Sequence, residues 1–386
     1  MRLHTGYEAV GVNLLDGSLD SLGLSLTPGS EYTIPPHSVR TFYSPNMGAS
    51  VLFRHSVESP PAIAREPHGL LAFYSDYVHQ LMSSRFNGPF RLLLSCPPNC
   101  GLGVSYAQLL CNVVVRNGCG AILVDLDPTG QSLLNVPGVV SAVLLEEVTS
   151  LEEGLTPYVP LVYGAGESPT GPRYTLAATT LAHTISALVT TERGPKALPL
   201  GGTVILCCST DPSVLTGVAM TYECTAVHVM VPSQGSALAD AVRHNYGQNP
   251  ISVIELPFVG RLNFPHVPRR LREYFYGART PLLPCKLSVR SVDLTLYEAS
   301  GEDNAVHRRE FSEALVRRAV AVCHAQREVE VPYCNFAGYM IVLSVVPDPI
   351  DEGVSEVSLA APGPGPLPSR FLILLPAAME PQELIP

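Results

Sequence analysis

The segment with the residue types and setting for chemistry is residues 96–103, which read Cys-Pro-Pro-Asn-Cys-Gly-Leu-Gly. It lies between an apolar run at 91–96 and a helix that we predict over 105–116. A phosphate-binding loop of the form GxxxxGK[ST] occupies the same setting, between a strand and a helix. There, backbone N–H groups surround the phosphates, the lysine pairs with the β and γ phosphates, and the hydroxyl holds magnesium. The segment therefore predicts a nucleotide phosphate site or its remnant.

Two positions of this degenerate loop (residues 96–103) depart from the pattern. Gly101 is kept, but Leu102 stands at the lysine position and Gly103 at the hydroxyl position. A register shifted by two residues places Ser105 on the magnesium but Val104 at the lysine position, so neither register supplies the cation. Losing one charged hydrogen bond removes roughly 1.5–3 kcal/mol of binding, and positioned charge supplies most of the rate of phosphoryl transfer. We therefore expect no catalytic residue here.

Two interpretations of the loop stay open. Backbone N–H groups and the start of a helix hold an anion weakly, or the segment is merely a strand-to-helix turn. We expect no bound metal and no cofactor, with ATP and magnesium present only if the pocket has survived. The residues of the degenerate nucleotide site are then Pro98, Asn99, Cys100, Gly101, Leu102 and Gly103.

Composition limits the partners. The net charge is −10 and the only lysines are Lys196 and Lys286, so broad electrostatic capture of DNA or RNA is excluded. Any contact with RNA is expected to be local and indirect. The ten cysteines lack the paired short spacings of a zinc site, which favours buried free thiols and a reducing compartment. No apolar run approaches the roughly 18 residues that span a bilayer, so we expect an intracellular protein without a membrane partner.

The hydrophobic pattern predicts an α/β fold class with three domains. Residues 1–78 alternate between apolar and polar positions broken by turn formers, which indicates a small N-terminal β domain. Residues 79–282 alternate strands with helices, including helices over 181–188 and 237–243, and indicate a central doubly wound parallel sheet like that of P-loop NTPases. Residues 283–386 return to strand patterns, with one helix expected between 310 and 326, and indicate a C-terminal β domain.

Six segments then give a resemblance that covers almost the whole chain. In order they are GSLDSLGLSL at 17–26, VDLDPTGQSLLNVPG at 124–138, PLVYGAGESPTG at 160–171, RLREYFYG at 270–277, AGYMIVLSVV at 337–346 and APGPGPLPSRFLIL at 361–374. The chain resembles the family of polynucleotide 5′-hydroxyl kinases that includes the Clp subunit of the pre-mRNA cleavage and polyadenylation machinery. The REYFYG and PLP-x-x-FL blocks are the most specific. The resemblance implies three domains, a nuclear complex and a cleavage-factor subunit of the Pcf type as direct partner.

On the nucleotide side, the resemblance places Asp127 at the family's metal-side or base-side aspartate and Gln131 loosely at its glutamine. The alternative for Asp127 is a residue that only ends a strand at the carboxyl edge of the sheet. The family's tryptophan after the second central strand is absent, because the chain has no tryptophan. The lysine that the N-terminal module lends to the nucleotide has no counterpart near residues 37–40. The family's residues are thus missing at several positions of the nucleotide pocket. This pattern indicates that the chain no longer depends on the pocket.

On the RNA side, Ser168 and Pro169 fall on the family's substrate-clasping Thr-Pro. Arg269, Arg270 and Arg272 resemble the basic run before the YFYG block. These arginines contact RNA, or they form a solvated helix face paired with nearby acids.

The leading hypothesis is a non-catalytic scaffold with a vestigial nucleotide site. The rival is an ATP-dependent RNA 5′-hydroxyl kinase in which an arginine, such as Arg116 or one near Arg270, replaces the missing lysine. A third reading is a chain that binds ATP without turning it over.

Overall fold

The computed structural model describes residues 1–6, 8–36, 38–44, 48–64, 89–97, 101–130, 134–151, 161–190, 198–231, 235–246, 251–257, 269–277, 282–299 and 305–379. The chain divides into two compact units, each built from segments that are far apart in the sequence. Unit 1 holds Met1–Val124, Val143–Val159 and Thr191–Phe264, and unit 2 holds Asp125–Ala142, Pro160–Thr190 and Pro265–Pro386. Residue 78 lies outside the described residues, and the domain boundaries at 78 and 282 stay predictions.

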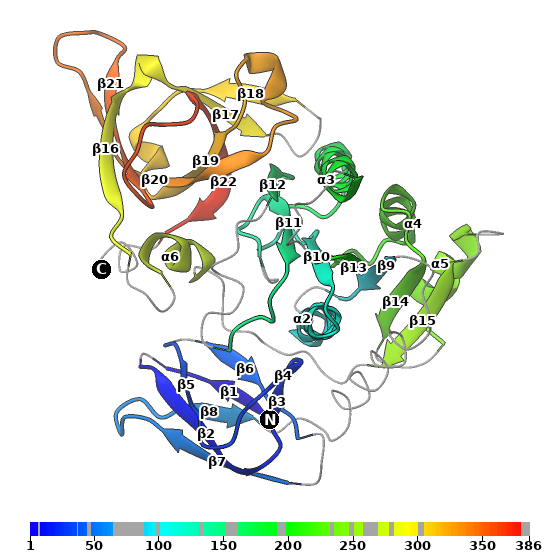
Figure 1. The fold of residues 1–386 in the computed structure, drawn as a ribbon. Coiled ribbons are helices and arrows are strands. Elements are labelled where there is room, and N and C mark those ends of the chain that lie inside the picture. The colour runs from blue at the N-terminus through cyan, green and yellow to red at the C-terminus, as the bar shows by residue number, and fades with distance from the viewer. Residues whose placement is uncertain are drawn as a thin grey trace. The chain divides into compact units, whose positions relative to one another are not determined.

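The amino-terminal part of unit 1 consists of short antiparallel strands (Figure 1). Buried and partly exposed positions alternate in β2, so Val10, Val12 and Leu14 all face the core, where Phe42 and Leu151 join them. Two three-stranded sheets result, in the orders β6-β1-β8 and β5-β2-β7, with a small hairpin of β3 and β4. The strands are β1 (Arg2–His4), β2 (Val10–Gly17), β3 (Asp20–Ser21), β4 (Leu24–Ser25), β5 (Glu31–Ile34), β6 (Val39–Thr41), β7 (Ala49–Arg54) and β8 (Ala62–Ala64).

The central sheet has seven strands in the order β12-β11-β10-β13-β9-β14-β15. Strand β9 pairs in parallel with both β13 and β14, and β12 runs antiparallel to β11, so the sheet is mixed. Parallel central strands are buried on both faces, which explains the continuous apolar run Leu92, Leu93 and Leu94. The strands are β9 (Phe90–Ser95), β10 (Gly120–Asp125), β11 (Val139–Leu145), β12 (Leu161–Gly164), β13 (Leu200–Cys207), β14 (Ala226–Val231) and β15 (Ser252–Pro257).

The helices between these strands begin where the local sequence favours a helix start. Helix α4 has Asp211 as N-cap, whose carboxylate accepts the Ser213 N–H at 2.8 Å, and Pro212 follows in the first turn. Figure 1 shows α2 and α4 on opposite sides of the sheet, as a doubly wound fold requires. No helix among the described residues combines the length and apolarity needed to cross a membrane. The helices are α2 (Gly101–Arg116), α3 (Pro172–Thr190), α4 (Pro212–Thr221) and α5 (Ala237–Tyr246).

The carboxyl-terminal half of α2 is hydrogen-bonded to the hairpin of β3 and β4. The Asn112 side chain is 1% exposed; its Nδ2 donates to the Leu22 carbonyl at 2.7 Å, and its Oδ1 accepts both the N–H and the hydroxyl of Thr149. Gly23 has φ +88°, and a Cβ there would lie 3.0 Å from the Cβ of Asn112. Close approach of the two backbones therefore requires glycine at this position.

The carboxyl-terminal part of unit 2 is a second seven-stranded sheet in the order β16-β21-β20-β19-β22-β17-β18, strongly curved in Figure 1. It buries apolar clusters on both faces, one of which includes Leu271 and Phe275 of helix α6 (Arg269–Tyr276). The strands are β16 (Cys285–Arg290), β17 (Thr295–Ala299), β18 (Val306–Arg309), β19 (Arg318–Cys323), β20 (Phe336–Pro347), β21 (Ser355–Ala361) and β22 (Phe371–Ala378).

The prediction of a helix between residues 310 and 326 is wrong. The structure has a single 3₁₀ turn at Glu313–Leu315, followed by strand β19 at Arg318–Cys323. Strands β20 and β22 pair with the two sides of β19, and both of its faces are buried. Burial on both faces removed the alternation that would have indicated a strand.

Candidate functional site

The degenerate loop joins β9 to α2 as the sequence predicts, but the helix begins at Gly101, earlier than the expected residue 105. Pro98, Asn99 and Cys100 lie outside the described residues. Gly101 and Leu102 form the first turn of α2, and their surroundings are likewise outside the described part of the structure. The site is therefore built from the residues on either side of them.

Gly103 lies where a phosphate loop carries its magnesium-binding hydroxyl. A Cβ at this position would stand 2.8 Å from both Cβ and Sγ of Cys96 and 3.2 Å from Sδ of Met230. Real Cβ atoms essentially never come within 3.0 Å of another heavy atom. The volume that a serine or threonine side chain needs is therefore already filled by side chains from β14 and from the residue after β9. Sequence reasoning noted the missing hydroxyl but not the packing that replaces it.

The neighbours of Gly103 belong to a buried apolar and thiol cluster. The Sγ atoms of Cys96 and Cys208 are 3.7 Å apart, and both residues are buried. Ser105, which a shifted register would place on the magnesium, is 4% exposed and lies within the helix face that packs on the sheet. Thiols here behave as small apolar groups, as free buried cysteines generally do.

Tyr106 and His228 form a buried polar pair between α2 and β14. The Tyr106 hydroxyl lies 3.2 Å from Nδ1 of His228, and both side chains are 0% exposed. Burial lowers the pKa of His228 to about 3, so the ring is neutral at physiological pH. The pair contributes packing rather than a charge to the neighbouring loop.

This pair predicts an acid-sensitive free energy of unfolding. Unfolded histidine binds a proton below about pH 6.5, whereas burial holds the pKa of His228 near 3. Protonation therefore favours the unfolded chain, and stability is lost as the pH falls from about 6.5, by up to about 1.4 kcal/mol per unit. Urea unfolding at pH 7, 6 and 5 should show a shallower decline for His228→Gln than for the wild type. Equal slopes would contradict the assignment.

The carboxylates of the acidic segment after β10 accept hydrogen bonds from residues of the same segment. The strand ends at Asp125, not at Asp127 as expected, because the Asp125 carboxylate accepts the Asp127 N–H at 3.1 Å and the Leu134 N–H at 2.9 Å. Asp127 is 2% exposed, and its Oδ1 accepts the N–H of Thr129 at 3.0 Å and its hydroxyl at 2.7 Å. Asp127 thus shapes a turn in this structure. Gln131 lies outside the described residues.

A buried asparagine that sequence reasoning missed completes this acidic segment. Asn135 is 0% exposed; its Nδ2 donates to the carbonyls of Asp125 and Asp127 at 3.0 and 2.8 Å. Its Oδ1 accepts the Ser141 hydroxyl at 2.5 Å. The partners of Asn135 come from residues 125–127 and from Ser141 in β11, and only its position before Val-Pro-Gly hinted at a structural role.

Ser168 and Pro169 lie in the exposed turn before α3, and the Ser168 hydroxyl is 2.8 Å from that of Thr170. Beside them, within unit 2, is a cavity of about 320 Å³. Its charged lining consists of Glu167, Glu298 and Arg318, and Nη2 of Arg318 already donates to the Leu375 carbonyl at 2.9 Å. Two carboxylates against one guanidinium do not suit a phosphate.

Two arginines of α6, Arg270 and Arg272, are engaged within their own helix. Arg270 makes an ion pair of 3.2 Å with Glu273, and Arg272 stacks on Tyr276 with 5.5 Å to the ring centroid. The side chain of Arg269 is outside the described residues. The Tyr274 hydroxyl accepts the Tyr339 N–H at 3.2 Å. Of the two alternatives for this run, the geometry favours the helix face paired with acids.

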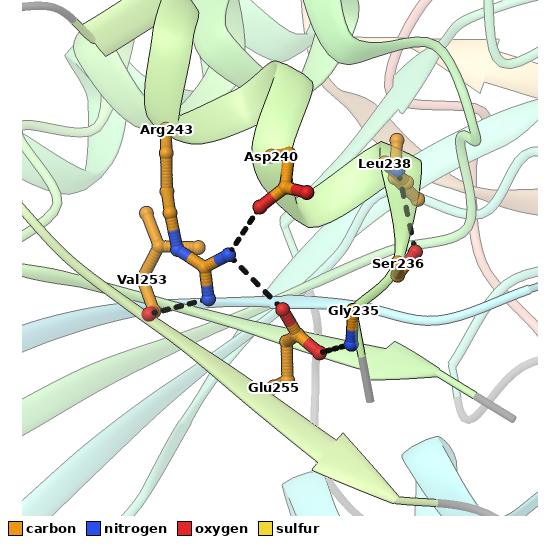
Figure 2. A network of polar contacts seen from close by, with 7 residues as sticks. All are labelled: Gly235, Ser236, Leu238, Asp240, Arg243, Val253 and Glu255. Atoms are coloured by element: carbon orange, nitrogen blue, oxygen red, sulfur yellow. Dashed lines mark hydrogen bonds and ion pairs between the residues drawn. The ribbon is translucent and has the colours of Figure 1, made fainter. Parts of the chain in front are cut away.

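Figure 2 shows a further network that joins α5 to β15 in unit 1. Arg243 donates to Asp240 at 2.7 Å and to Glu255 at 3.0 Å, and Glu255 accepts the Gly235 N–H at 2.8 Å. The Gly235 N–H and then Arg243 lower the pKa of Glu255. This arginine too is structural, and no cluster of three metal-ligating side chains occurs in the described ranges.

Comparison with known proteins gives matches along the chain. The family described as mRNA cleavage and polyadenylation factor CLP1 P-loop matches residues 104–277. A CLP1 homolog from Nematostella vectensis is 26% identical over 95% of this chain and 90% of its own length. The polyribonucleotide 5′-hydroxyl-kinase Clp1 of Xenopus tropicalis is 25% identical over 96% of this chain and 90% of its own length.

Solved structures agree in fold. A Clp1p–Pcf11p complex has a TM-score of 0.76 at 18% identity, covering 98% of this chain and 96% of the other. A second, on the extended Pcf11p–Clp1p interface, has a TM-score of 0.78 at 16% identity with the same coverage. The predicted α/β class with flanking β domains is confirmed. The family match over residues 104–277 and the relatives that align over nearly the whole length support the resemblance of this chain to the Clp family.

Proposed function

We propose that the chain is a non-catalytic scaffold subunit of the pre-mRNA 3′-end cleavage and polyadenylation machinery, acting in the nucleus, with a vestigial nucleotide site. The observation that carries this proposal is the packing of Gly103 against Cys96 and Met230. An eroded site that had merely lost its hydroxyl would leave room where the side chain had been. In this chain the side chains of Cys96 and Met230 fill that space.

The extent of the family match supports the same conclusion. It begins at residue 104, directly after the degenerate loop, and continues through the REYFYG block to residue 277. The matched residues thus include helices and strands of the central sheet, and they do not include the loop that would hold phosphate. Retention of a fold without its phosphate contacts favours a role in assembly.

The proposed direct partner is a Pcf-type protein. Both solved relatives are Clp1p complexes with Pcf11p, and this chain aligns with 96% of each Clp1p chain. The net charge of −10 and the engaged arginines of α6 favour protein partners over direct capture of RNA.

The second candidate function is an ATP-dependent RNA 5′-hydroxyl kinase, which the names of several relatives favour. It needs an arginine at the missing lysine. Arg116 lies at the opposite end of α2, about 22 Å from Gly101 at 1.5 Å per residue. Its Nη1 donates to the Gly23 carbonyl at 2.8 Å and lies 3.5 Å from Asp20. Binding of ATP without turnover is the remaining alternative.

We expect no transfer of labelled phosphate from ATP to a 5′-hydroxyl RNA oligonucleotide above the level of an Asp127→Ala control. The Xenopus tropicalis Clp1 serves as the positive control in the same assay. Saturating Mg-ATP should leave the melting midpoint unchanged, because a ligand raises it only by binding the folded state. Tagged chain should co-purify a Pcf-type subunit from nuclear extract.

The outcomes separate the alternatives. Phosphate transfer would establish the kinase, and a raised midpoint without transfer would establish structural ATP binding. Failure to recover any cleavage-factor subunit would contradict the scaffold role.

A further inference from the structure

The cavity of about 320 Å³ in unit 2 lies against strand β22, and we call it the β22 cavity. Its lining combines residues 373–376 of β22, residues from the strands on either side of β22, and the glycine-rich residues 138, 164 and 166–168. Ligand pockets in proteins measure about 300–1,000 Å³. The β22 cavity is at the small end of this range and therefore suits a small group, such as a single side chain of a binding partner.

Strand pairing and a hydrogen bond place two charged residues on the wall of the β22 cavity. Strand β22 lies between β17 and β19 in the sheet. In β17, Glu298 pairs with Leu374 of β22. In β19, Nη2 of Arg318 donates to the Leu375 carbonyl at 2.9 Å. A carboxylate and a guanidinium therefore approach consecutive residues of β22 from its two sides.

The glycine-rich wall is fixed against the next residue of β22. Gly138 packs so closely on Pro376 that a Cβ on the glycine would stand 2.7 Å from Cγ of the proline. The Ala165 N–H donates to the Gly138 carbonyl at 2.8 Å. These two contacts hold the exposed turn that carries Glu167 beside β22, so a second carboxylate lines the same cavity.

Gly164 supplies main-chain groups to this wall. It belongs to β12, which ends the central sheet in the described part of the structure and pairs with β11 in antiparallel fashion. Hydrogen-bonded and non-bonded pairs alternate along such strands. Since Ala165 donates toward the β11 side, the N–H and carbonyl of Gly164 point away from β11. Extended peptides bind other proteins through main-chain groups at a strand edge of this kind.

The charged groups favour a cationic ligand that also carries a hydrogen-bond acceptor. Glu167 is exposed and forms no ion pair within the described ranges. Glu298 contacts Arg309 at 3.5 Å, but both side chains are about half-exposed, and such surface pairs contribute little. Nε of Arg318 is buried and has no hydrogen-bond partner among the described residues. A basic residue of a peptide offers both a cation for the carboxylates and a main-chain carbonyl for this donor.

We propose that the β22 cavity binds a lysine or arginine residue of an extended peptide segment from a protein partner. The side-chain cation pairs with Glu167 and Glu298, and a peptide carbonyl accepts the Nε hydrogen of Arg318. The main chain of the peptide pairs with Gly164. The same carboxylates repel the phosphates of nucleic acids. This binding depends neither on the nucleotide site nor on the scaffold role.

The test measures the binding of synthetic peptides to the full chain by fluorescence anisotropy. The probe is a labelled peptide with blocked ends in which one arginine stands between alanines. The matched peptide has norleucine at that position, which keeps an alkyl chain and lacks the charge. We expect the norleucine peptide to bind at least about tenfold more weakly, because hydrogen bonds between charged groups are the stronger ones. Methylation of the main-chain nitrogens next to the arginine should weaken binding several-fold, since it blocks pairing with Gly164.

Variants of the chain locate the site. Glu167→Gln and Glu298→Gln keep the size of the side chain and remove its charge, so each should weaken binding of the arginine peptide a few-fold and the double variant about tenfold. Glu352→Gln is the control, because Glu352 is exposed and lies outside the cavity lining. It should leave the affinity unchanged, and thermal melting followed by circular dichroism checks that all variants are folded.

Three outcomes would overturn the proposal. They are no measurable binding of the arginine peptide, equal affinity for the arginine and norleucine peptides, and a double variant that binds the arginine peptide as tightly as Glu352→Gln does.

Discussion

Replacing Gly103 by threonine, the residue of an intact phosphate loop, is expected to lower the free energy of unfolding by about 2–3 kcal/mol rather than restore a magnesium site. The new Cβ would stand 2.8 Å from two atoms of Cys96, one of them a Cβ fixed to the backbone, so the strand end must move. Urea unfolding of the wild type and the variant measures the loss. The same variant should show no change of melting midpoint with Mg-ATP.

Gly217 in α4 is the matched control for this substitution. It too is a helical glycine, but a Cβ there meets no atom within 4 Å. Gly217→Thr should therefore change stability by only a few tenths of a kcal/mol, as helix propensity dictates. Cys96→Gly in the Gly103→Thr background should recover part of the loss. If Gly103→Thr is as stable as Gly217→Thr, the packing argument is wrong.

Asp125→Ala is expected to cost about 2–5 kcal/mol of stability. The Asp125 side chain is 0% exposed and accepts the N–H groups of Asp127 and Leu134. Its removal leaves one buried and one partly buried donor without this acceptor, at about 1–3 kcal/mol each. Chemical denaturation measures the change. The chain has no tryptophan, so far-UV circular dichroism replaces tryptophan fluorescence as the probe.

Asp127→Ala provides the comparison within the same segment. Its carboxylate accepts the N–H and the hydroxyl of Thr129, two residues away, and we expect a loss of about 1 kcal/mol. Asp125 thus organises the segment, although Asp127 was the residue that the resemblance selected. An Asp127→Ala loss equal to or larger than that of Asp125→Ala would reverse this assignment.

The sequence alone was sufficient to predict those helices and strands whose type depends on the local hydrophobic pattern. The apolar run at 226–231 is strand β14 at Ala226–Val231, and the helix expected over 237–243 is α5 at Ala237–Tyr246. These elements are short apolar or amphipathic segments between turn formers, so the period of the pattern decides their type. The fold class followed from their alternation.

What the sequence could not supply are contacts between distant segments. Cys96 and Met230 surround Gly103 from positions before and far after it, and nothing in the spacing of these residues indicates that they meet. Strand β19 was missed for a related reason. Its type is fixed by pairing with β20 and β22, which tertiary structure supplies.

Helix α2 is held at one end by Cys96 and Met230 and at the other by hydrogen bonds of Asn112. Residues of the chain itself make these contacts, so none of them depends on the concentration of a small molecule. A protein whose helix start is held by bound nucleotide loses stability when that nucleotide is depleted, in proportion to the logarithm of its concentration. With the vestigial site that we propose, this chain should keep the same folded population in starved and in growing cells.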